Sequence, residues 1–279
     1  MSDAVRPVAA AAATRPDAPA RDRRRITPMQ LWWSFVVLFE LGFFLFVLGM
    51  STQNPNFTLD YRWHMEASRR LLDTGTPYHA YQLAGPYSLQ EGLIPAIGAP
   101  ILYPPIAFAL FIPFLWLPAL LWWAIPITIL VFCMTRHRPP LWGWALTGAC
   151  FCWLPSIGVY IFGNPGMWIA AFVAAGTVWS WPFVLVLLKP TFAPIALLGA
   201  THRSWWVALA VLGAISVLFW PVWFDWFTIL DNADLTLGYN TPTVPLMVAP
   251  LIPWLLDPRH PIRGWVARRL VRGAAPAPA

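Results

Sequence analysis

The sequence predicts an all-α integral membrane protein, a polytopic bundle of about eight transmembrane segments. Of the 279 residues, 58% are hydrophobic and only 11% are charged, whereas an ordinary soluble domain has about 25% charged residues. Two long runs, residues 92–135 and 139–188, contain no charged side chain, and each is long enough for two helices of about 20 apolar residues. This composition excludes a water-soluble enzyme, a disordered protein and a nucleic-acid-binding protein.

Shorter apolar segments complete the set of predicted membrane spans. Residues 31–50 form a first span, and the uncharged runs 204–224 and 235–256 hold one span each. A short apolar piece follows Lys189 and reaches Gly199. We therefore expect about seven full spans and one short or broken span. The first span should be retained, because its apolar core is longer than the roughly 7–15 residues of a signal peptide and no small-residue cleavage site follows it.

The chain ends carry the charges that set the orientation. Residues 1–27 are predicted to be a disordered tail rich in Arg, Ala and Pro, and residues 257–279 form a second basic tail. Because positively charged loops and tails stay in the cytoplasm, both ends should be cytoplasmic, beside anionic membrane lipids. The number of spans is then even. The transmembrane domain covers residues 28–256 of a multi-pass protein of the cell membrane.

One basic cluster does not fit this topology. Counting spans from the N-terminus places Arg136, His137 and Arg138 on the outer side, against the positive-inside rule. Either the cluster is an exception, or one segment between residues 101 and 135 enters the membrane without crossing it. The choice also decides on which side Asn164 and Lys189 lie.

The first outer loop, residues 51–100, is far longer than the median connection of about 4–6 residues. From Leu59 to Leu72, apolar and small side chains recur at helical spacing on one side, which includes Leu72, while polar groups occupy the other. Gly75 follows as a stop signal. This pattern predicts an amphipathic helix at the membrane surface.

Asp60 stands near the start of this predicted helix, immediately beyond the first span. One interpretation is an acidic residue that complements the positive end of the helix dipole. The other is a catalytic base at the membrane–water boundary, where partial burial tunes its pKa. The residues alone leave both interpretations open.

Several short motifs resemble integral membrane glycosyltransferases of the GT-C superfamily, and specifically glycosyltransferase family 87. The motifs occur in the family's order along roughly residues 30–225. They are Asp60–Tyr61, Gly75–Tyr78, Tyr103–Pro105, Gly163–Asn164 and Leu188–Pro190.

The resemblance implies an enzyme that moves a hexose, with mannose as the expected sugar, from a polyprenyl-phosphate donor to a lipid or glycan acceptor on the extracytoplasmic side. It implies that an acidic residue of the first outer loop activates the acceptor hydroxyl, and the matching residue is Asp60. Polyprenyl phosphate is already a fair leaving group. We therefore expect no metal ion and no cofactor.

Lys189 is the only lysine in the chain and lies within apolar sequence. An ionisable group in such a position is a functional candidate, here for binding the donor phosphate, because Pro190 predicts a helix break that exposes it. The alternatives are that Lys189 reaches the membrane interface or pairs with Glu40, the single acid of the first span. Glu40 is itself a candidate site residue.

Three further candidates follow Asp60 on the predicted surface helix. They are Arg62, His64 and Glu66, which can contact a phosphate or a sugar, or can simply face water.

Three further polar residues fall near the ends of apolar segments. Tyr78 and Tyr103 can border the substrate cavity or belong to an interfacial aromatic belt. Asn164 can be a polar group of the cavity or a turn residue.

Two other functions stay open at this stage. A lipid or solute transporter would use Glu40 and Lys189 as intramembrane charges and would show internal repeats, which the sequence lacks. Members of the resembled family have more spans after the lysine motif than this chain has, which leaves an inactive or partner-dependent scaffold as the other alternative.

Overall fold

The computed structural model describes residues 57–88, 100–234 and 241–259, which all belong to one compact unit. These residues are mostly helical, which confirms the predicted all-α class. The predicted first span with Glu40, the N-terminal tail and the C-terminal tail after Arg259 lie outside the described residues.

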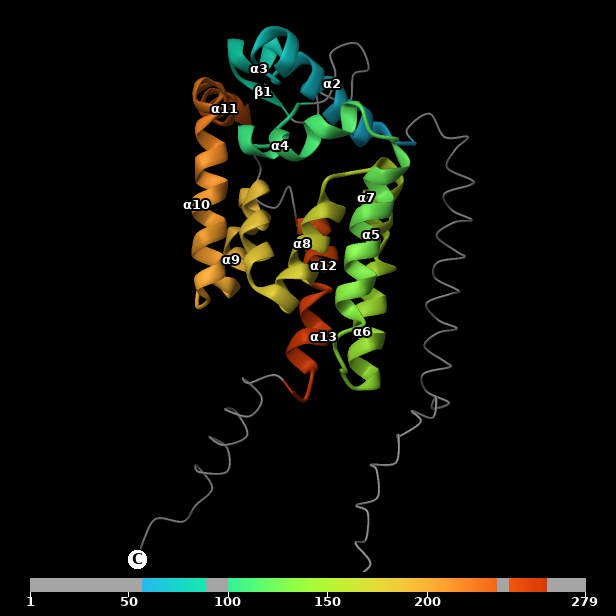
Figure 1. The fold of residues 1–279 in the computed structure, drawn as a ribbon. Helices are drawn as coiled ribbons and strands as arrows, with labels where there is room; N and C mark the ends of the chain where they lie inside the picture. The colour runs from blue at the N-terminus through green and yellow to red at the C-terminus, as the bar shows by residue number, and fades with distance from the viewer. Residues whose placement is uncertain (1–56, 89–99, 235–240, 260–279) are drawn as a thin grey trace, which may run out of the picture. The chain divides into compact units, whose positions relative to one another are not determined.

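The helices are numerous and mostly short (Figure 1). The α-helices are α2 (Leu59–Thr74), α3 (Ala80–Ala84), α4 (Phe108–Phe111), α5 (Leu120–Met134), α6 (Leu141–Phe151), α7 (Leu154–Phe162), α8 (Gly166–Trp179), α9 (Ala193–Ala196), α10 (Arg203–Val217), α11 (Trp220–Asn232), α12 (Val244–Val248) and α13 (Leu251–Leu256). The 3-10 helices are η2 (Pro105–Ala107), η3 (Ile112–Leu115), η4 (Trp181–Leu188), η5 (Pro190–Phe192), η6 (Leu197–Gly199) and η7 (Thr241–Thr243). Two short strands, β1 (Tyr87–Ser88) and β2 (Ala233–Asp234), pair in parallel.

Prolines account for much of this fragmentation. Proline lacks an N–H group and clashes with the preceding turn, so it is tolerated mainly in the first turn of a helix. Pro155 and Pro221 occupy the first turn of α7 and α11, and Pro118 precedes α5. Each marks a sharp bend in a long apolar run. The apolar runs of the sequence therefore fold as pairs of short helices.

By length and composition, no single helix among the described residues can cross a membrane, whereas three bent pairs pass the same test when taken together. The pairs are residues 105–115 with α5, bent by 118°, α6 with α7, bent by 57°, and α10 with α11, bent by 91°. The first pair differs from the two full spans expected in residues 92–135. This 11-residue segment, of four α-helical and seven 3-10 residues, is about 20 Å long, roughly two thirds of the hydrocarbon thickness of about 30 Å.

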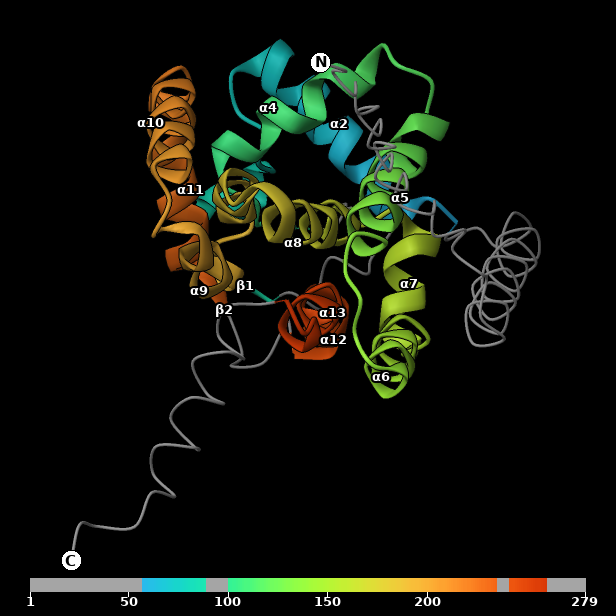
Figure 2. The same ribbon diagram turned by 60° about the horizontal axis from the view of Figure 1, so that its bottom comes forward.

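The core is organised around α8. Every residue from Gly166 to Gly176 is buried, which is typical of a helix that is covered on all sides. α5, η4 and α12 pack against it, and Figure 2 shows α8 in the middle of these elements. Trp168 of α8 contacts Trp122 of α5, with ring centroids 5.6 Å apart. The two helices are therefore fixed to one another along their length.

The predicted surface helix is present as α2, and Gly75 ends it with a left-handed backbone conformation (φ 84°). The burial of its side chains does not follow a simple division into an apolar and a polar side. Leu72, of the predicted apolar side, is 52% exposed, whereas the polar His64 is 5% exposed. The reason is that α2 packs against the η2–η3 segment through its central turns, which covers His64 and leaves Leu72 beyond the contact.

Candidate functional site

Asp60 and Asn164 form the centre of the candidate site. Asp60 lies in the first turn of α2, and its Oδ2 accepts a hydrogen bond of 2.6 Å from Nδ2 of Asn164. Oδ1 of Asn164 accepts a bond of 2.8 Å from the backbone N–H of Gly166. Because this N–H can only donate, it fixes which end of the amide faces Asp60. Asn164 therefore lies in the turn between α7 and α8 and binds Asp60, while its role as a polar group of a substrate cavity stays a prediction.

The backbone around Asn164 is held by close contacts between α2, α5 and α7. The N–H of Thr58, just before α2, donates to the carbonyl of Ile161 at 3.1 Å. Gly163 has φ +69°, and a side-chain Cβ there would lie 2.7 Å from Trp123 and 2.9 Å from Tyr61. Only glycine fits this position. The turn therefore carries Asn164 to Asp60 in one fixed orientation.

His64 lies one helical turn after Asp60 and is buried. Its Nδ1 is 2.5 Å from the carbonyl oxygen of Asp60, so Nδ1 carries the proton, because a carbonyl only accepts. The imidazole contacts the edges of Tyr103 and Phe111, with centroids 5.0 Å apart in both cases. Within the described part of the chain, Nε2 is buried and has no hydrogen-bond partner.

Burial lowers the pKa of His64 to about 4, and the charge of Lys189 acts in the same direction, against the hydrogen bond to the Asp60 carbonyl. The imidazole is therefore neutral at pH 7. Its Nε2 lone pair is available to accept a hydrogen bond from a ligand.

Lys189 reaches the same place from another part of the chain. It connects η4 with η5, and the helical conformation is interrupted at this residue (φ −127°, ψ 88°), as the following Pro190 predicted. Its Nζ lies 5.8 Å from the ring centroid of Tyr103 and 5.6 Å from that of Phe192. Tyr103 is therefore a neighbour of both Lys189 and His64.

The cost of burying the ionised carboxyl of Asp60 is only partly offset by its neighbours. Burial raises its pKa, while the hydrogen bond from Asn164 and the charge of Lys189 oppose this rise. Among the described residues, Asp60 and Lys189 make no direct ion pair, and no hydrogen bond reaches Oδ1 of Asp60. A carboxylate in this state is a stronger base than one exposed to water.

The remaining predicted site residues lie apart from this centre. Tyr78 is 1% exposed and donates from its hydroxyl to the Tyr103 carbonyl at 2.9 Å, so it supports the Tyr103 backbone. Arg62 and Glu66 lie on the exposed side of α2, where Glu66 pairs with Arg70 at 3.4 Å. Arg62 and Glu66 are therefore not part of the Asp60 cluster.

Two residues that support the site were missed in the sequence. The indole N–H groups of Trp122 and Trp123 donate to the carbonyls of Gly163 and Tyr160, both at 2.8 Å. These bonds hold the C-terminal end of α7, which directly precedes Asn164 in the sequence. Nothing in the local sequence distinguishes these two tryptophans from the other 17.

No family model, curated protein or solved structure matches this chain.

Proposed function

We propose that the protein is a polytopic membrane glycosyltransferase that moves a hexose from a polyprenyl-phosphate donor to an acceptor hydroxyl, with Asp60 as the general base. The expected acceptor is a lipid or a glycan on the extracytoplasmic side. The observation that carries the proposal is the meeting of Asp60, His64, Tyr103, Asn164 and Lys189, which come from distant parts of the sequence.

The charges of this cluster suit the proposed reaction. The charge of Lys189 acts on Asp60 without a direct contact between the two side chains, so a carboxylate and an ammonium group from two elements lie near each other. Transfer from a sugar phosphate needs both, because a hydroxyl proton must be accepted and the charge on the leaving phosphate must be balanced.

The proposed step is a single displacement. Asp60 takes the proton of the acceptor hydroxyl while the oxygen attacks the anomeric carbon of the donor. The bond between that carbon and the phosphate oxygen breaks, and its electron pair leaves with polyprenyl phosphate. The ammonium group of Lys189 balances the charge of the departing phosphate.

The other residues of the cluster have positioning roles in this proposal. Asn164 holds one carboxylate oxygen of Asp60 and leaves Oδ1 for the acceptor hydroxyl. Nε2 of His64 accepts a hydrogen bond from a sugar hydroxyl. Tyr103, a neighbour of both His64 and Lys189, supplies an aromatic surface, on which sugars and cations both pack well.

The test is a transfer assay in lipid with radiolabelled polyprenyl-phosphate sugars and an extract of membrane lipids as acceptor. Wild type should transfer label, and Asp60→Asn should not. Asp73→Asn, at the exposed end of the same helix, is the matched control and should behave like wild type. Folded wild type that transfers from no donor would favour the scaffold or transporter, and an active Asp60→Asn would remove Asp60 from the mechanism.

A further inference from the structure

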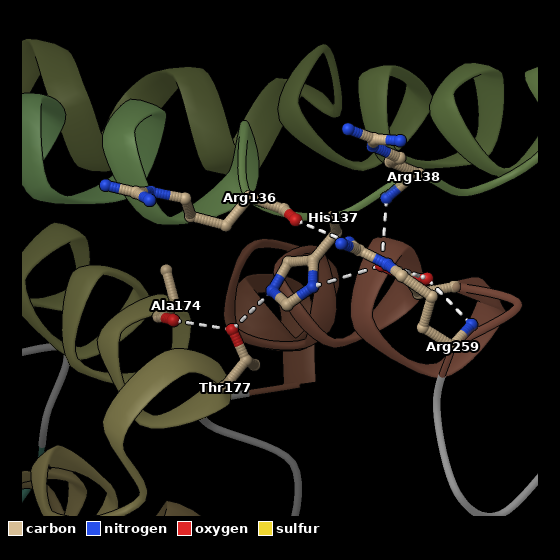
Figure 3. A network of polar contacts seen from close by, with 7 residues as sticks. Arg136, His137, Arg138, Ala174, Thr177 and Arg259 are labelled. Carbon is tan, nitrogen blue, oxygen red and sulfur yellow. Dashed lines mark hydrogen bonds and ion pairs between the residues drawn. The ribbon is translucent and has the colours of Figure 1, made fainter. Parts of the chain in front are cut away.

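A second polar network lies at the C-terminal ends of α5, α8 and α13 (Figure 3). Asp257, which is 3% exposed, accepts hydrogen bonds from the backbone N–H of Arg138 at 3.0 Å and from the side chain and backbone of Arg259. Arg259 also donates to the carbonyl of Arg136 at 2.7 Å. The connection between α5 and α6 is thereby tied to the beginning of the C-terminal tail.

His137 ties α8 into the same network. The Thr177 hydroxyl donates to the Ala174 carbonyl at 2.6 Å, so it accepts from Nε2 of His137, 2.8 Å away. Nδ1 of His137 is 3.8 Å from Asp257. The loop 136–138, the end of α8 and the end of α13 therefore lie together.

This network and the Asp60 site lie at opposite ends of one helix pair. α8 begins just after Asn164, which binds Asp60, and ends just after Thr177, which binds His137. Its 14 residues correspond to about 21 Å. α5, packed beside it, likewise has Trp122, which binds the Gly163 carbonyl, in its first turn and ends at Met134, before Arg136.

Combined with the proposed membrane insertion, these contacts favour one of the two topologies that the sequence left open. If Asp60 is outside, the loop with Arg136 and Arg138 is on the cytoplasmic side, together with Arg259. Residues 105–115 then enter the membrane without crossing it, which agrees with the 118° bend before α5.

Between Arg138 and Lys189 the chain runs between the two ends of this helix pair three times, through α6–α7, α8 and η4, where two spans were expected. α8 and η4 taken alone are each shorter than a membrane span. Lys189 returns to the Asp60 end, where its contact with Tyr103 places it.

The cytoplasmic end has the composition of a membrane interface. Arg136 and Arg138 are exposed, and the Arg136 guanidinium lies 4.5 Å above the ring of Phe132. Phe132 in turn stacks on Trp179 at 6.2 Å, although both rings are more than 40% exposed. Exposed aromatic rings next to arginines are typical of the level of the lipid headgroups.

A hollow of about 290 Å³ opens within this region, lined by Arg136, His137, Thr177, Val178, Trp254, Asp257 and Arg259. The carboxylate of Asp257 offsets one of the three guanidinium charges of the network, so the surface remains positive. Hydrogen bonds from Arg259, above all, hold the pKa of Asp257 well below its usual range, so that this balance does not change at physiological pH.

We propose that Arg136 and Arg259, which line this hollow, together with the exposed Arg138 beside it, form a cytoplasmic binding site for the phosphate headgroup of an anionic phospholipid. The adjoining exposed rings of Phe132 and Trp179 favour a lipid over a nucleic acid or a soluble anion, since they supply apolar surface next to the charge. The site rests on the proposed membrane insertion and not on glycosyl transfer.

The first test determines the side of the membrane. A membrane-impermeant maleimide is applied to intact and permeabilised cells expressing Arg138→Cys or Glu66→Cys, with wild type giving the baseline of the native cysteines. Glu66→Cys should gain label in intact cells, and Arg138→Cys only after permeabilisation. Labelling of both in intact cells would overturn the cytoplasmic site, even if the transferase assay succeeds.

The second test measures lipid binding by native mass spectrometry of the detergent-purified full chain. Phosphatidylglycerol should bind more tightly than phosphatidylcholine, and Arg136→Gln/Arg138→Gln should weaken its binding roughly tenfold or more. Arg62→Gln/Arg69→Gln removes the same charge from the other end of the molecule and should change binding less than about twofold.

Two results would overturn the lipid assignment. Equal losses in both double variants would show that binding follows total charge rather than this site. Complete displacement of phosphatidylglycerol by excess inorganic phosphate would show a site for the free ion. Retention of the lipid in phosphate supports the proposal. Failure of sugar transfer alone would leave these expected results unchanged, so the two proposals fail separately.

Discussion

Asp60 and Asp257 lie at opposite ends of the α5–α8 pair and have opposite surroundings. Asp60 receives one side-chain hydrogen bond from a neutral amide, and burial raises its pKa. Asp257 is bound by the Arg138 and Arg259 backbones and by the Arg259 guanidinium, which lower its pKa. A carboxylate that is fully satisfied stabilises structure, whereas one that is incompletely satisfied retains the capacity to accept a proton.

The largest expected effect is the loss of transfer in Asp60→Asn. Removing a general base typically lowers kcat by about 10²–10⁴-fold. The thermal unfolding midpoint should stay the same or rise, because the buried carboxylate no longer has to be ionised in the folded protein. Transfer rate and midpoint are measured on the same preparation. A large fall in the midpoint would assign Asp60 a structural role like that of Asp257.

Lys189→Gln should raise the KM for the donor by about 10–100-fold, the equivalent of losing a charged hydrogen bond of roughly 1.5–3 kcal/mol. It should also change the pH dependence. Because the charge of Lys189 lowers the pKa of Asp60, its removal should move the acidic limb of the pH–rate profile to higher pH. Profiles of kcat against pH for both proteins check this. An unshifted limb would show that the charge of Lys189 does not influence the ionisation of Asp60.

Asp257→Asn should act on stability instead of chemistry. Losing the charged hydrogen bonds of a buried carboxylate costs about 1–3 kcal/mol, which lowers Tm by roughly 2–10 °C in a protein of this size. Transfer per folded molecule should be preserved. Asp231→Asn, on the exposed side of α11, is the control.

The same variant has a defined pH dependence. Because the folded-state pKa of Asp257 is lowered, its contribution is complete above the unfolded pKa of about 3.9 and disappears as pH falls through the lower folded value. The Tm difference between wild type and Asp257→Asn should therefore be constant from about pH 7 to pH 5 and shrink in stronger acid. A difference that grows in acid would contradict the lowered pKa.

Asn164→Ala should have an intermediate effect on catalysis. The carboxylate of Asp60 loses the hydrogen bond that orients it and opposes the rise of its pKa, which is worth about 1–1.5 kcal/mol or roughly tenfold in kcat. Binding of the donor, measured as KM, should change little. A kcat equal to that of wild type would show that Asp60 does not depend on Asn164 for its orientation.

The smallest effects are expected on the exposed side of α2. Arg62→Gln and Glu66→Gln should each change kcat and KM by less than about twofold, and Glu66→Gln removes a surface ion pair worth about 0–1 kcal/mol. A tenfold loss in either variant would place the exposed side of α2 in the substrate site and extend the site beyond the Asp60 cluster.

The sequence by itself determined the local features. It predicted the all-α class, the helix from Leu59 with its stop at Gly75, the break at Lys189 and the position of Asp60 in a first helical turn. These features follow from periodicity, glycine and proline, which act within a few residues. The expected membrane spans remain a prediction from composition.

The tertiary structure decided which of these residues meet. Asn164 and Asp60 are 104 positions apart, and Arg138 and Asp257 are 119 apart. Packing of α2 buried His64, a polar residue of that helix, and bends at prolines divided the long apolar runs into pairs of short helices. Such contacts depend on how helices pack across the whole unit, and no local pattern encodes them.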